Sequence, residues 1–456
     1  MSNSYSTVWS RCRLATKRAA MRLAIKIVSH LPDQGLVALS YVAEKLTYGK
    51  PAKTVIKQFR ELIKINHPSI GLVRRILNDT QPQIRKKLVD NLIINGFLLN
   101  QEKKLAATAV GEAVPTTILI SPTMRCNLNC VGCYAGNYNK ADDLTFFVFD
   151  RIIREAKDMG VSFFTLLGGE PLFYPHLFDI LEKHQDVFFQ CYTNGTLIDG
   201  AMADKISAVG NVLPILSIEG HEKETDERRG AGVHEKVLKA MDILKSRKIP
   251  FGFSVAVTNK NAELISSDEF IDDMIKRGAY LGWFFLYMPV GKGPDLSLMP
   301  TPAQRRMLVD RVAHIRETKP LFIVDFWNDA PFVGGCIAGK EYVHITSKGD
   351  VEPCIFTHFA VDNIKDKSLK EVMNSDFFRD LRRRQPYNEN LYMPCMWIDN
   401  PEVSREVIAQ FHAYPTHEGA DDVLVKEELK AGVDAYAAKI KEIYDPLWEK
   451  MSQPKK

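Results

Sequence analysis

Three cysteines at short spacing form the most reactive stretch of the sequence. Cys126, Cys130 and Cys133 lie four and three residues apart, directly after the apolar run 117–120. A loop that follows a strand and presents three thiols in one direction is a chelating arrangement. Cubane iron–sulfur clusters usually take four thiolates, one for each iron. Three cysteines therefore favour a cluster with one iron left open, to which a substrate or cofactor can bind.

Zinc and disulfide chemistry are the alternatives for this loop. Structural zinc commonly takes four Cys or His ligands in C-x2-4-C pairs, and no fourth Cys or His stands near the loop in the sequence. A redox disulfide would need only a C-x-x-C pair. Three unrelated core cysteines are a remote alternative at this density.

Polar segments also follow three other predicted strands. They are Gly168-Gly169-Glu170-Pro171, residues 193–196 and residues 217–220. A Gly-rich turn after one strand is usually only a turn. The carboxyl ends of parallel strands meet at one edge, however, and active sites lie there. Together these segments suit an amino-acid head group and a ribose held beside a cluster.

The elements that would position these loops alternate between strand and helix from residue 115 to about residue 320. A helix is predicted from a cap at Thr145 to a stop at Gly160. This alternation predicts an α/β fold built as an open or partial (β/α)6 barrel. The six expected strands are Thr117–Ser121, Ser162–Leu167, Val187–Tyr192, Leu213–Ile218, Gly252–Val257 and Trp283–Met288.

The first 110 residues differ from the rest in charge. They hold 19 Lys and Arg against 6 Asp and Glu, within a chain of net charge +4. Helical periodicity is expected over 14–46, 53–66 and 70–96, and a basic helical region suits an anionic membrane surface or a nucleic acid. Nucleic acid is the weaker partner because no row of aromatic residues is interleaved to stack on bases.

Composition places the chain among soluble globular proteins. With 456 residues, 45% apolar and 25% charged, it has room for two or three domains with substantial cores. Eight clustered cysteines fit metal binding in a reducing compartment better than a disulfide scaffold. We find no apolar run of the ~18 residues that a membrane span needs. We therefore expect a cytoplasmic protein, docked by residues 1–110 on the inner membrane face if the basic helices bind lipid.

The cysteine loop and the polar segments resemble those of radical S-adenosylmethionine (SAM) enzymes, whose usual pattern is C-x3-C-x2-C after the first strand. The resemblance covers about residues 115–320. It implies a [4Fe–4S] cluster on Cys126, Cys130 and Cys133, with SAM at the open iron. It also implies that residues 168–171 bind the SAM amino group, chiefly through Glu170. Contacts to the ribose or carboxylate would come from Asn194, Ser217 and Arg229.

The resemblance also implies the reaction and an electron donor. A reduced cluster would cleave SAM to a 5′-deoxyadenosyl radical, which would take a hydrogen atom from the substrate. Flavodoxin or ferredoxin is the kind of donor expected. One residue departs from the family pattern. Gly132 stands before the third cysteine, where the family often has an aromatic residue that touches the adenine.

A second cysteine group follows the barrel. A predicted hairpin, with strands 343–346 and 351–354, and the cysteines Cys336, Cys354 and Cys395 resemble a SPASM or twitch extension with one auxiliary [4Fe–4S] cluster. Its fourth ligand would be absent or non-cysteine, with His358 as a candidate. The alternative is a degenerate extension of buried thiols.

These patterns divide the chain into four regions. They are a helical domain 1–112, the barrel 113–320, the SPASM-like region 321–400 and a helical tail 401–456, which we expect to pack outside the barrel or to pair with a partner. A helix is expected near 369–384. Cys12 and Cys191 are interpreted as structural.

Three functions are compatible with these observations. The first is a radical enzyme that acts on a C–H bond of a membrane lipid. The second is a peptide or protein maturase, in which residues 53–110 would form a winged-helix recognition domain with Lys103–Val110 as its wing. The third is an iron–sulfur scaffold or redox sensor, which would not need the polar segments at the strand ends.

Overall fold

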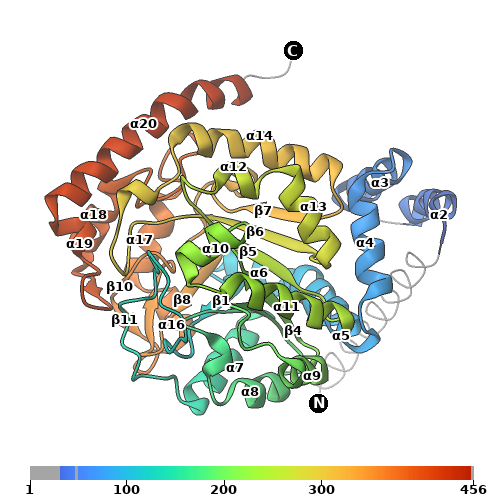
Figure 1. Cartoon of the computed structure of the whole chain (residues 1–456), viewed down its shortest axis with the longest axis horizontal. Coiled ribbons are helices and arrows are strands. Elements are labelled where there is room, and N and C mark those ends of the chain that lie inside the picture. Colours follow the sequence, from blue (N-terminus) through green and yellow to red (C-terminus); the bar gives the residue numbers. More distant parts are fainter. Residues whose placement is uncertain (1–30, 47–49, 453–456) are drawn as a thin grey trace.

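A ten-stranded sheet organises the chain in the computed structural model, which describes residues 31–46 and 50–452. In space the strands follow the order β11-β9-β8-β1-β2-β3-β4-β5-β6-β7 (Figure 1). The first seven in sequence are parallel neighbours. They are β1 (Thr117–Ile120), β2 (Phe163–Leu166), β3 (Phe188–Thr193), β4 (Val212–Ser217), β5 (Gly252–Val257), β6 (Leu281–Leu286) and β7 (Phe322–Asp325).

The predicted α/β class and six-stranded partial barrel are confirmed, with each strand within two residues of its expected ends. The expectation that the pattern stops at Pro320 was wrong, because β7 continues the sheet after that residue. The apolar run 321–324 is as long as strands β1 and β2, although Phe322 at the start of β7 is exposed. The run was not counted as a strand because the barrel was expected to end at Pro320.

The predicted hairpin extends the opposite edge of the sheet. Strand β8 (Tyr342–Ile345) pairs in parallel with β1, and β9 (Asp350–Glu352) pairs with β8 in the antiparallel direction. Strand β11 (Asp362–Asn363) completes this edge, while β10 (Phe359–Ala360) pairs with β12 (Tyr414–Pro415) in a separate ribbon. The extension is therefore continuous with the barrel.

Helices cover the outer face of the barrel. Helix α7 (Phe146–Met159) begins after Thr145, whose hydroxyl accepts the Val148 N–H at 3.3 Å, and ends at Gly160 with φ 101°, as predicted. The other helices of this region are α8 (Leu177–Lys183), α9 (Gly200–Val209), α10 (Glu222–Arg229), α11 (Val233–Ser246), α12 (Ala262–Ile265), α13 (Asp268–Arg277), α14 (Pro302–Thr318), α15 (Ala330–Val333) and the short turns η2 (Pro171–Phe173) and η3 (Leu296–Leu298).

The strands read as nearly continuous apolar runs because helices cover their outer face and the barrel encloses the other. Phe164, Phe189 and Phe253 are fully buried in one core that joins strands and helices. This rigid frame fixes where the strand-end loops lie.

The region before the barrel is helical throughout its described part. It contains α2 (Asp33–Leu46), α3 (Lys50–Lys64), α4 (Pro68–Asp79), α5 (Pro82–Lys87), a π-helical segment η1 (Leu88–Leu99) and α6 (Gln101–Ala109). The winged-helix interpretation was wrong, because Lys103–Val110 lies almost entirely in helix α6 and not in a wing. The expected helix 70–96 is divided at Pro82, and most of the expected helix 14–31 lies outside the described residues.

These helices cover the barrel end at which the strands begin. The Arg75 guanidinium donates to the carbonyls of Pro320 and Ala279 at 3.1 and 3.2 Å, just before β7 and β6. The Asn91 amide donates to the carbonyl of Val187, just before β3, at 3.0 Å. The cysteine loop leaves the other end of the strands, so helices α4 and η1 lie opposite it (Figure 1).

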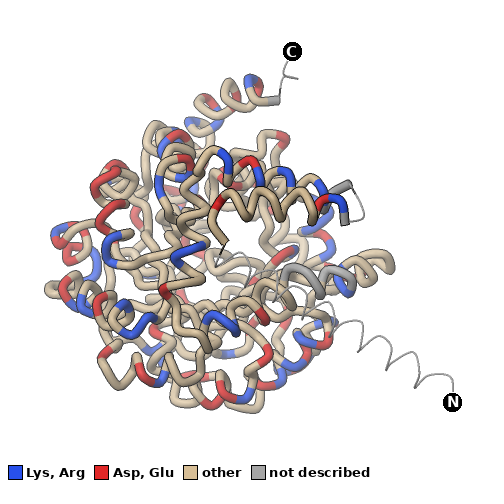
Figure 2. The backbone as a smooth tube through the Cα atoms, turned by 90° about the vertical axis from the view of Figure 1, so that its right-hand side faces the viewer, with Lys and Arg blue, Asp and Glu red and all other residues tan. Residues whose placement is uncertain are grey.

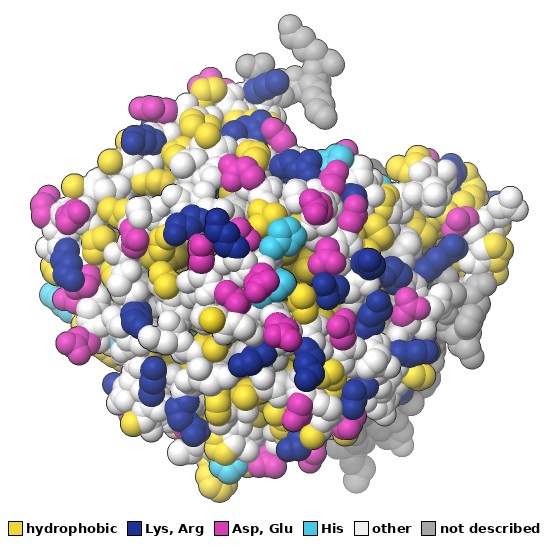
Figure 3. Space-filling model, in the orientation of Figure 1, with side chains coloured by type: hydrophobic (Ala, Val, Ile, Leu, Met, Phe, Trp, Pro, Cys, Tyr) yellow, Lys and Arg dark blue, Asp and Glu magenta, His cyan; other side chains and the backbone are white. Residues whose placement is uncertain are grey.

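Several basic residues of these helices are used within the chain. Arg60 pairs with Glu44, Arg74 with Asp33 at 2.6 Å, and Lys86 with Asp90 at 3.4 Å. Blue and red segments alternate along the tube seen from this side in Figure 2. Charges of both signs are likewise mixed on the face shown in Figure 3.

The chain ends in helices that pack on the barrel. The expected helix near 369–384 is two helices, α16 (Leu369–Met373) and α17 (Asp376–Arg384), and α18 (Pro401–Phe411), α19 (Asp422–Val425) and α20 (Glu427–Ser452) follow. Helix α20 lies against α14 on the outside, as predicted for the tail (Figure 1). Within residues 31–46 and 50–452, no helix combines the length and apolar character needed to cross a membrane.

Candidate active site

The cysteine loop is held by backbone contacts from the neighbouring strand ends. The N–H groups of Gly169 and Glu170 donate to the carbonyls of Thr123 and Arg125 at 3.1 and 2.8 Å. On the other side, the Val131 N–H donates to the Arg228 carbonyl at 2.8 Å. The loop is therefore anchored at both ends by the segments after β2 and in α10.

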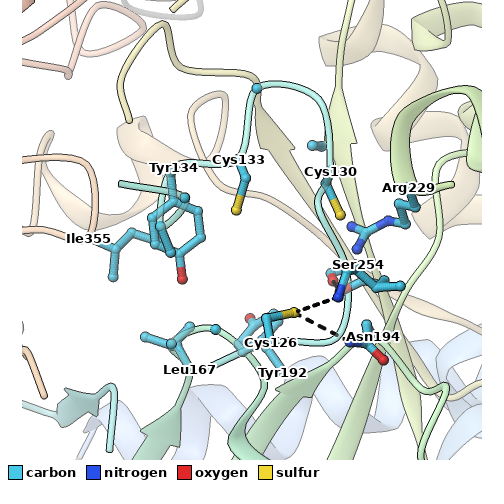
Figure 4. Close-up of a pocket in the computed structure, with 18 of the residues that line it drawn as sticks. Cys126, Cys130, Cys133, Tyr134, Leu167, Tyr192, Asn194, Arg229, Ser254 and Ile355 are labelled. Atoms are coloured by element: carbon cyan, nitrogen blue, oxygen red, sulfur yellow. Dashed lines mark hydrogen bonds between the residues drawn. The ribbon is translucent and has the colours of Figure 1, made fainter. Parts of the chain in front are cut away.

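The three thiols of this loop line one cavity of about 190 Å³. Figure 4 shows Cys126, Cys130 and Cys133 with their sulfur atoms directed into the same space. Burial raises the pKa of the Cys126 and Cys130 thiols, while the positive charges of Arg229 and Arg228 lower that of Cys130. The positive charges of Arg228 and Arg229 thus stabilise a thiolate, which is the form of cysteine that ligates a metal or cluster.

The donor set fits a cluster better than one metal ion. Among the described residues, no three His, Cys, Asp or Glu side chains are arranged to hold a single ion. An iron–sulfur cluster spreads its ligands over separate irons, so its thiols need not meet at one point. The residues present therefore fit a [4Fe–4S] cluster with three protein ligands.

Glycines bring the backbone close around this cavity. At Gly132, with φ 60°, an added Cβ would come within 2.4 Å of the Tyr287 ring. At Gly169 it would come within 2.4 Å of the Met124 and Arg125 carbonyls. Gly168 and Gly169 line the cavity, so the predicted glycine pair allows the close approach of two loops.

Glu170 and Pro171, by contrast, lie behind the cavity wall. The Glu170 carboxylate is fully buried and accepts hydrogen bonds from the Thr193 hydroxyl at 2.7 Å, the Asn194 N–H at 2.7 Å and the Leu172 N–H at 3.1 Å. Burial raises the pKa of Glu170 to about 6 despite these bonds. The carboxylate connects the loops after β2 and β3, and its predicted contact with an ammonium group stays a prediction.

The other predicted SAM contacts line the cavity. The Asn194 amide donates to Asn127 Oδ1 at 2.9 Å and to Cys126 Sγ at 3.7 Å. The Ser217 hydroxyl lies 3.4 Å from that of Ser254. Asn194 follows β3, Ser217 ends β4 and Arg229 ends helix α10, and all three line one cavity. Their contacts with SAM stay predictions.

Arg229 shares its partner with Arg228, which the sequence analysis missed. Both guanidinium groups lie 2.5 Å from Oε1 of the fully buried Glu219, which also accepts the Ala256 N–H at 3.0 Å through Oε2. One carboxylate thus fixes two arginines at the cavity edge.

Sequence reasoning also missed several uncharged cavity residues. Most of them lie in or next to the end of a strand or close after a cysteine, but uncharged residues in such positions are not distinguished from core residues by sequence. The missed residues are Tyr134, Tyr192, Ser254, Phe285, Tyr287 and Phe356.

The second cysteine group lines its own cavity of about 170 Å³. Cys336, Cys354 and Cys395 meet there among aromatic side chains, and residues of β7 and β8 also line the cavity. Burial raises the pKa of all three thiols, that of Cys395 to about 12. The Tyr342 hydroxyl donates to Cys354 Sγ at 3.1 Å. Three thiols in an apolar cavity fit one auxiliary cluster.

His358 is not a ligand candidate in this structure. It is buried outside the second cavity, where its Nε2 lies 2.9 Å from the Ile355 carbonyl and its Nδ1 lies 2.7 Å from His417 Nε2. Because both ring nitrogens have protein partners, the proposed fourth-ligand role was wrong. Cys191 is buried in β3, as expected for a structural thiol, and Cys12 lies outside the described residues.

Two family models match the chain. Residues 120–271 match the Radical SAM superfamily, and residues 336–396 match an iron–sulfur cluster-binding domain named SPASM. Each match contains one of the two cysteine groups.

Curated relatives cover the same region. An AdoMet-dependent heme synthase of Methanosarcina barkeri is 27% identical over 59% of this chain and 85% of its own. An uncharacterized protein of Methanocaldococcus jannaschii is 32% identical over 43% of this chain and 70% of its own. The mycofactocin maturase MftC of Mycobacterium tuberculosis is 29% identical over 60% of this chain and 74% of its own.

A solved structure shares the fold. Streptococcus suis SuiB bound to S-adenosylmethionine aligns with a TM-score of 0.54 and 22% identity, over 64% of this chain and 74% of that one. This likeness supports the partial barrel with its C-terminal extension.

Proposed function

The chain belongs to the radical SAM superfamily and carries a SPASM-like domain, and from this premise we propose that it is a maturase that modifies a peptide. Its cofactors are S-adenosylmethionine and [4Fe–4S] clusters, including an auxiliary one. The relative named mycofactocin maturase supports a maturase role, and the peptide class of substrate rests on the cavity lining described below.

The residues at the first cavity would have separate tasks. The bound cluster and SAM supply a 5′-deoxyadenosyl radical that removes a hydrogen atom from the substrate. Cys126, Cys130 and Cys133 would hold the cluster. Arg229, oriented by Glu219, would bind the SAM carboxylate, and the Ser217 and Asn194 side chains would orient the ribose. The Glu170 carboxylate, which accepts the Asn194 N–H behind the cavity wall, would hold the Asn194 backbone in place.

One observation carries the proposal: the two three-cysteine cavities share a wall at Phe356, and neither has a histidine among its lining residues in the described chain. Three cations, Lys140, Arg228 and Arg229, line the first cavity, and the two arginines share the single carboxylate of Glu219. Among the described residues that line the second cavity, Asp329 is the only charged one. The lining of the second cavity suits a largely uncharged substrate segment, while the positive balance of the first suits the SAM carboxylate.

A tetrapyrrole is the second candidate substrate, favoured by the heme synthase relative. Haem carries propionate groups and an iron that accepts axial ligands such as His. The lack of histidine among the described residues that line the two cavities supports the peptide over this alternative.

The lipid and scaffold hypotheses have less support. The described basic helices cover the barrel end opposite the cysteine loop, and several of their charges are paired internally. None of the relatives named above acts on a lipid by its name. A scaffold or sensor would not need Asn194, Ser217 and Arg229 around an open cavity.

Synthetic peptides encoded by short reading frames beside the gene test the proposal. Each is incubated anaerobically with the reconstituted, reduced protein and SAM, and 5′-deoxyadenosine and peptide mass are measured. We expect one peptide to raise 5′-deoxyadenosine formation and to change in mass. Stimulation by a propionate-bearing iron porphyrin, with every peptide unchanged, would reject the peptide assignment.

A further inference from the structure

The wall between the two cavities is made of aromatic rings. Phe356 lines both cavities. Trp283 and Phe285 point to the same side of β6 and stack with ring centroids 5.5 Å apart and an interplanar angle of 2°. Phe285 lines the first cavity and Trp283 the second. The space between the two groups of cysteines is therefore bordered by the stacked rings of Trp283 and Phe285.

Two further rings extend this wall inside the barrel. Tyr192 on β3 contacts Phe285 and Trp283, with centroids 5.8 and 6.3 Å apart. Phe326, next to β7, contacts the same two rings at 5.5 and 6.5 Å. All four rings keep intermediate exposure although they face the barrel interior. They border open space and are not closed into the core.

One polar atom in this wall lacks a partner. Trp283 Nε1 is buried and makes no hydrogen bond within the described residues. The indole N–H is a donor only, and a buried donor left unpaired is unfavourable. An oxygen on a bound molecule would satisfy it.

Charge is scarce on the Trp283 side of the wall. Among the described residues that line the second cavity, Asp329 is the one charged residue, and it pairs with Arg316 at 2.6 Å. A charged group placed against the rings on this side would lose its hydration without gaining an opposite charge. The Trp283 side of the wall thus discriminates against charged side chains.

We propose that this aromatic wall selects an apolar side chain, aromatic or branched aliphatic, of the substrate, with Trp283 Nε1 donating to a carbonyl or hydroxyl oxygen of the same residue. The proposal deepens the maturase assignment, on which its peptide context rests. Trp283 is then a specificity-determining residue, and Tyr192, Phe285 and Phe326 provide the apolar surface.

Binding of capped amino acids tests the wall directly. N-acetyl-L-leucinamide, N-acetyl-L-tyrosinamide, N-acetyl-L-lysinamide and N-acetyl-L-glutamamide are titrated by ligand-observed NMR into the anaerobic, SAM-loaded holoprotein. We expect the leucine and tyrosine amides to bind at about millimolar concentration, in keeping with their size. The lysine amide should bind at least tenfold more weakly.

The variant Trp283→Phe keeps a ring and removes the N–H. It should weaken binding of the two apolar amides about fivefold, the effect of one hydrogen bond. Trp448→Phe on α20 is the matched control and should change nothing, because α20 lies outside the barrel. Equal binding of lysine and leucine amides, or unchanged affinity in Trp283→Phe, would overturn the proposal.

The result of the amide titrations can be interpreted independently of the result of the maturase assay. Binding of capped amino acids requires no reduction of the cluster and no turnover. A protein that acted on a porphyrin would fail the peptide assay, while the amide titrations would still decide whether the wall prefers apolar side chains.

Discussion

Glu170 is a buried carboxylate that joins the loops after β2 and β3. Burial raises its pKa to about 6, even though three hydrogen bonds favour the ionised carboxylate. Because the folded-state pKa exceeds the ordinary value of 4.5, ionisation opposes folding. Its stabilising effect is fully present below about pH 4.5 and is lost as the pH rises through about 6.

We expect this loss to be measurable with Glu170→Gln. From about pH 4 to about pH 8, the unfolding free energy of the wild type should fall relative to that of the variant by about 2 kcal/mol. Urea denaturation of the metal-free proteins measures it. Burial also raises the pKa of Asp325 to about 6, but this residue is present in both proteins, so its contribution to the pH dependence cancels. A pH-independent difference would contradict the placement of the carboxylate.

The two cysteine groups should be separable by mutation. Replacing Cys126, Cys130 and Cys133 by Ala should remove about four iron atoms per chain and abolish 5′-deoxyadenosine formation. Replacing Cys336, Cys354 and Cys395 should remove a similar amount of iron and leave the first cluster spectroscopically intact.

Cys191→Ala serves as the control, since Cys191 is buried in β3 away from both groups of ligands. It should retain both clusters. If either triple variant kept the full iron content, the corresponding ligand assignment would be rejected.

At the scale of elements, a buried ion pair fixes the loop that carries Cys395. Arg305 on α14 donates to both oxygens of Asp399 at 2.6 and 3.0 Å, and both side chains are fully buried. Asp399 Oδ2 in turn accepts the Cys395 N–H at 3.0 Å. Helix α14 thereby positions the third thiol of the second cavity.

Arg305→Met should leave Asp399 buried without its partner and destabilise the protein by about 3–5 kcal/mol. We expect loss of the auxiliary iron with the first cluster retained, measured by iron content and electron paramagnetic resonance. Arg306→Met is the matched control, because the Arg306–Asp310 pair lies near the surface and exposed pairs contribute little. An intact auxiliary cluster in Arg305→Met would refute this positioning role.

Sequence patterns predicted the elements with strong local signals. The cap at Thr145 and the stop at Gly160 gave α7 correctly, and the three-cysteine spacing and glycine pair led to the first cavity. Local patterns alone did not join β7 to the barrel, because its place depends on pairing with β6. Nor could they predict that His358 would face His417, since that contact joins segments 59 residues apart.

In the whole molecule, the position of the helices before the barrel reduces the support for a membrane-lipid substrate. The sequence indicated a basic, helical region before the barrel, and its described part, 31–46 and 50–110, is largely helical. The sequence could not indicate that helices α4 and η1 would cover the barrel end opposite the cysteine loop.

We therefore expect anionic phospholipid vesicles to leave 5′-deoxyadenosine formation unchanged. The measurement compares reduced, reconstituted protein with and without vesicles at low salt, where attraction to a charged surface is strongest. A several-fold increase with vesicles would restore the lipid substrate as the leading hypothesis.

We propose that radical chemistry at the first cavity acts on a peptide. Deuterium transfer into 5′-deoxyadenosine tests this, with a peptide encoded by one of the short reading frames beside the gene and labelled at its apolar side chains. Mass spectrometry measures both products, and we expect deuterated 5′-deoxyadenosine together with a peptide of altered mass. Unlabelled 5′-deoxyadenosine, with every peptide unchanged and an iron porphyrin consumed instead, would contradict it.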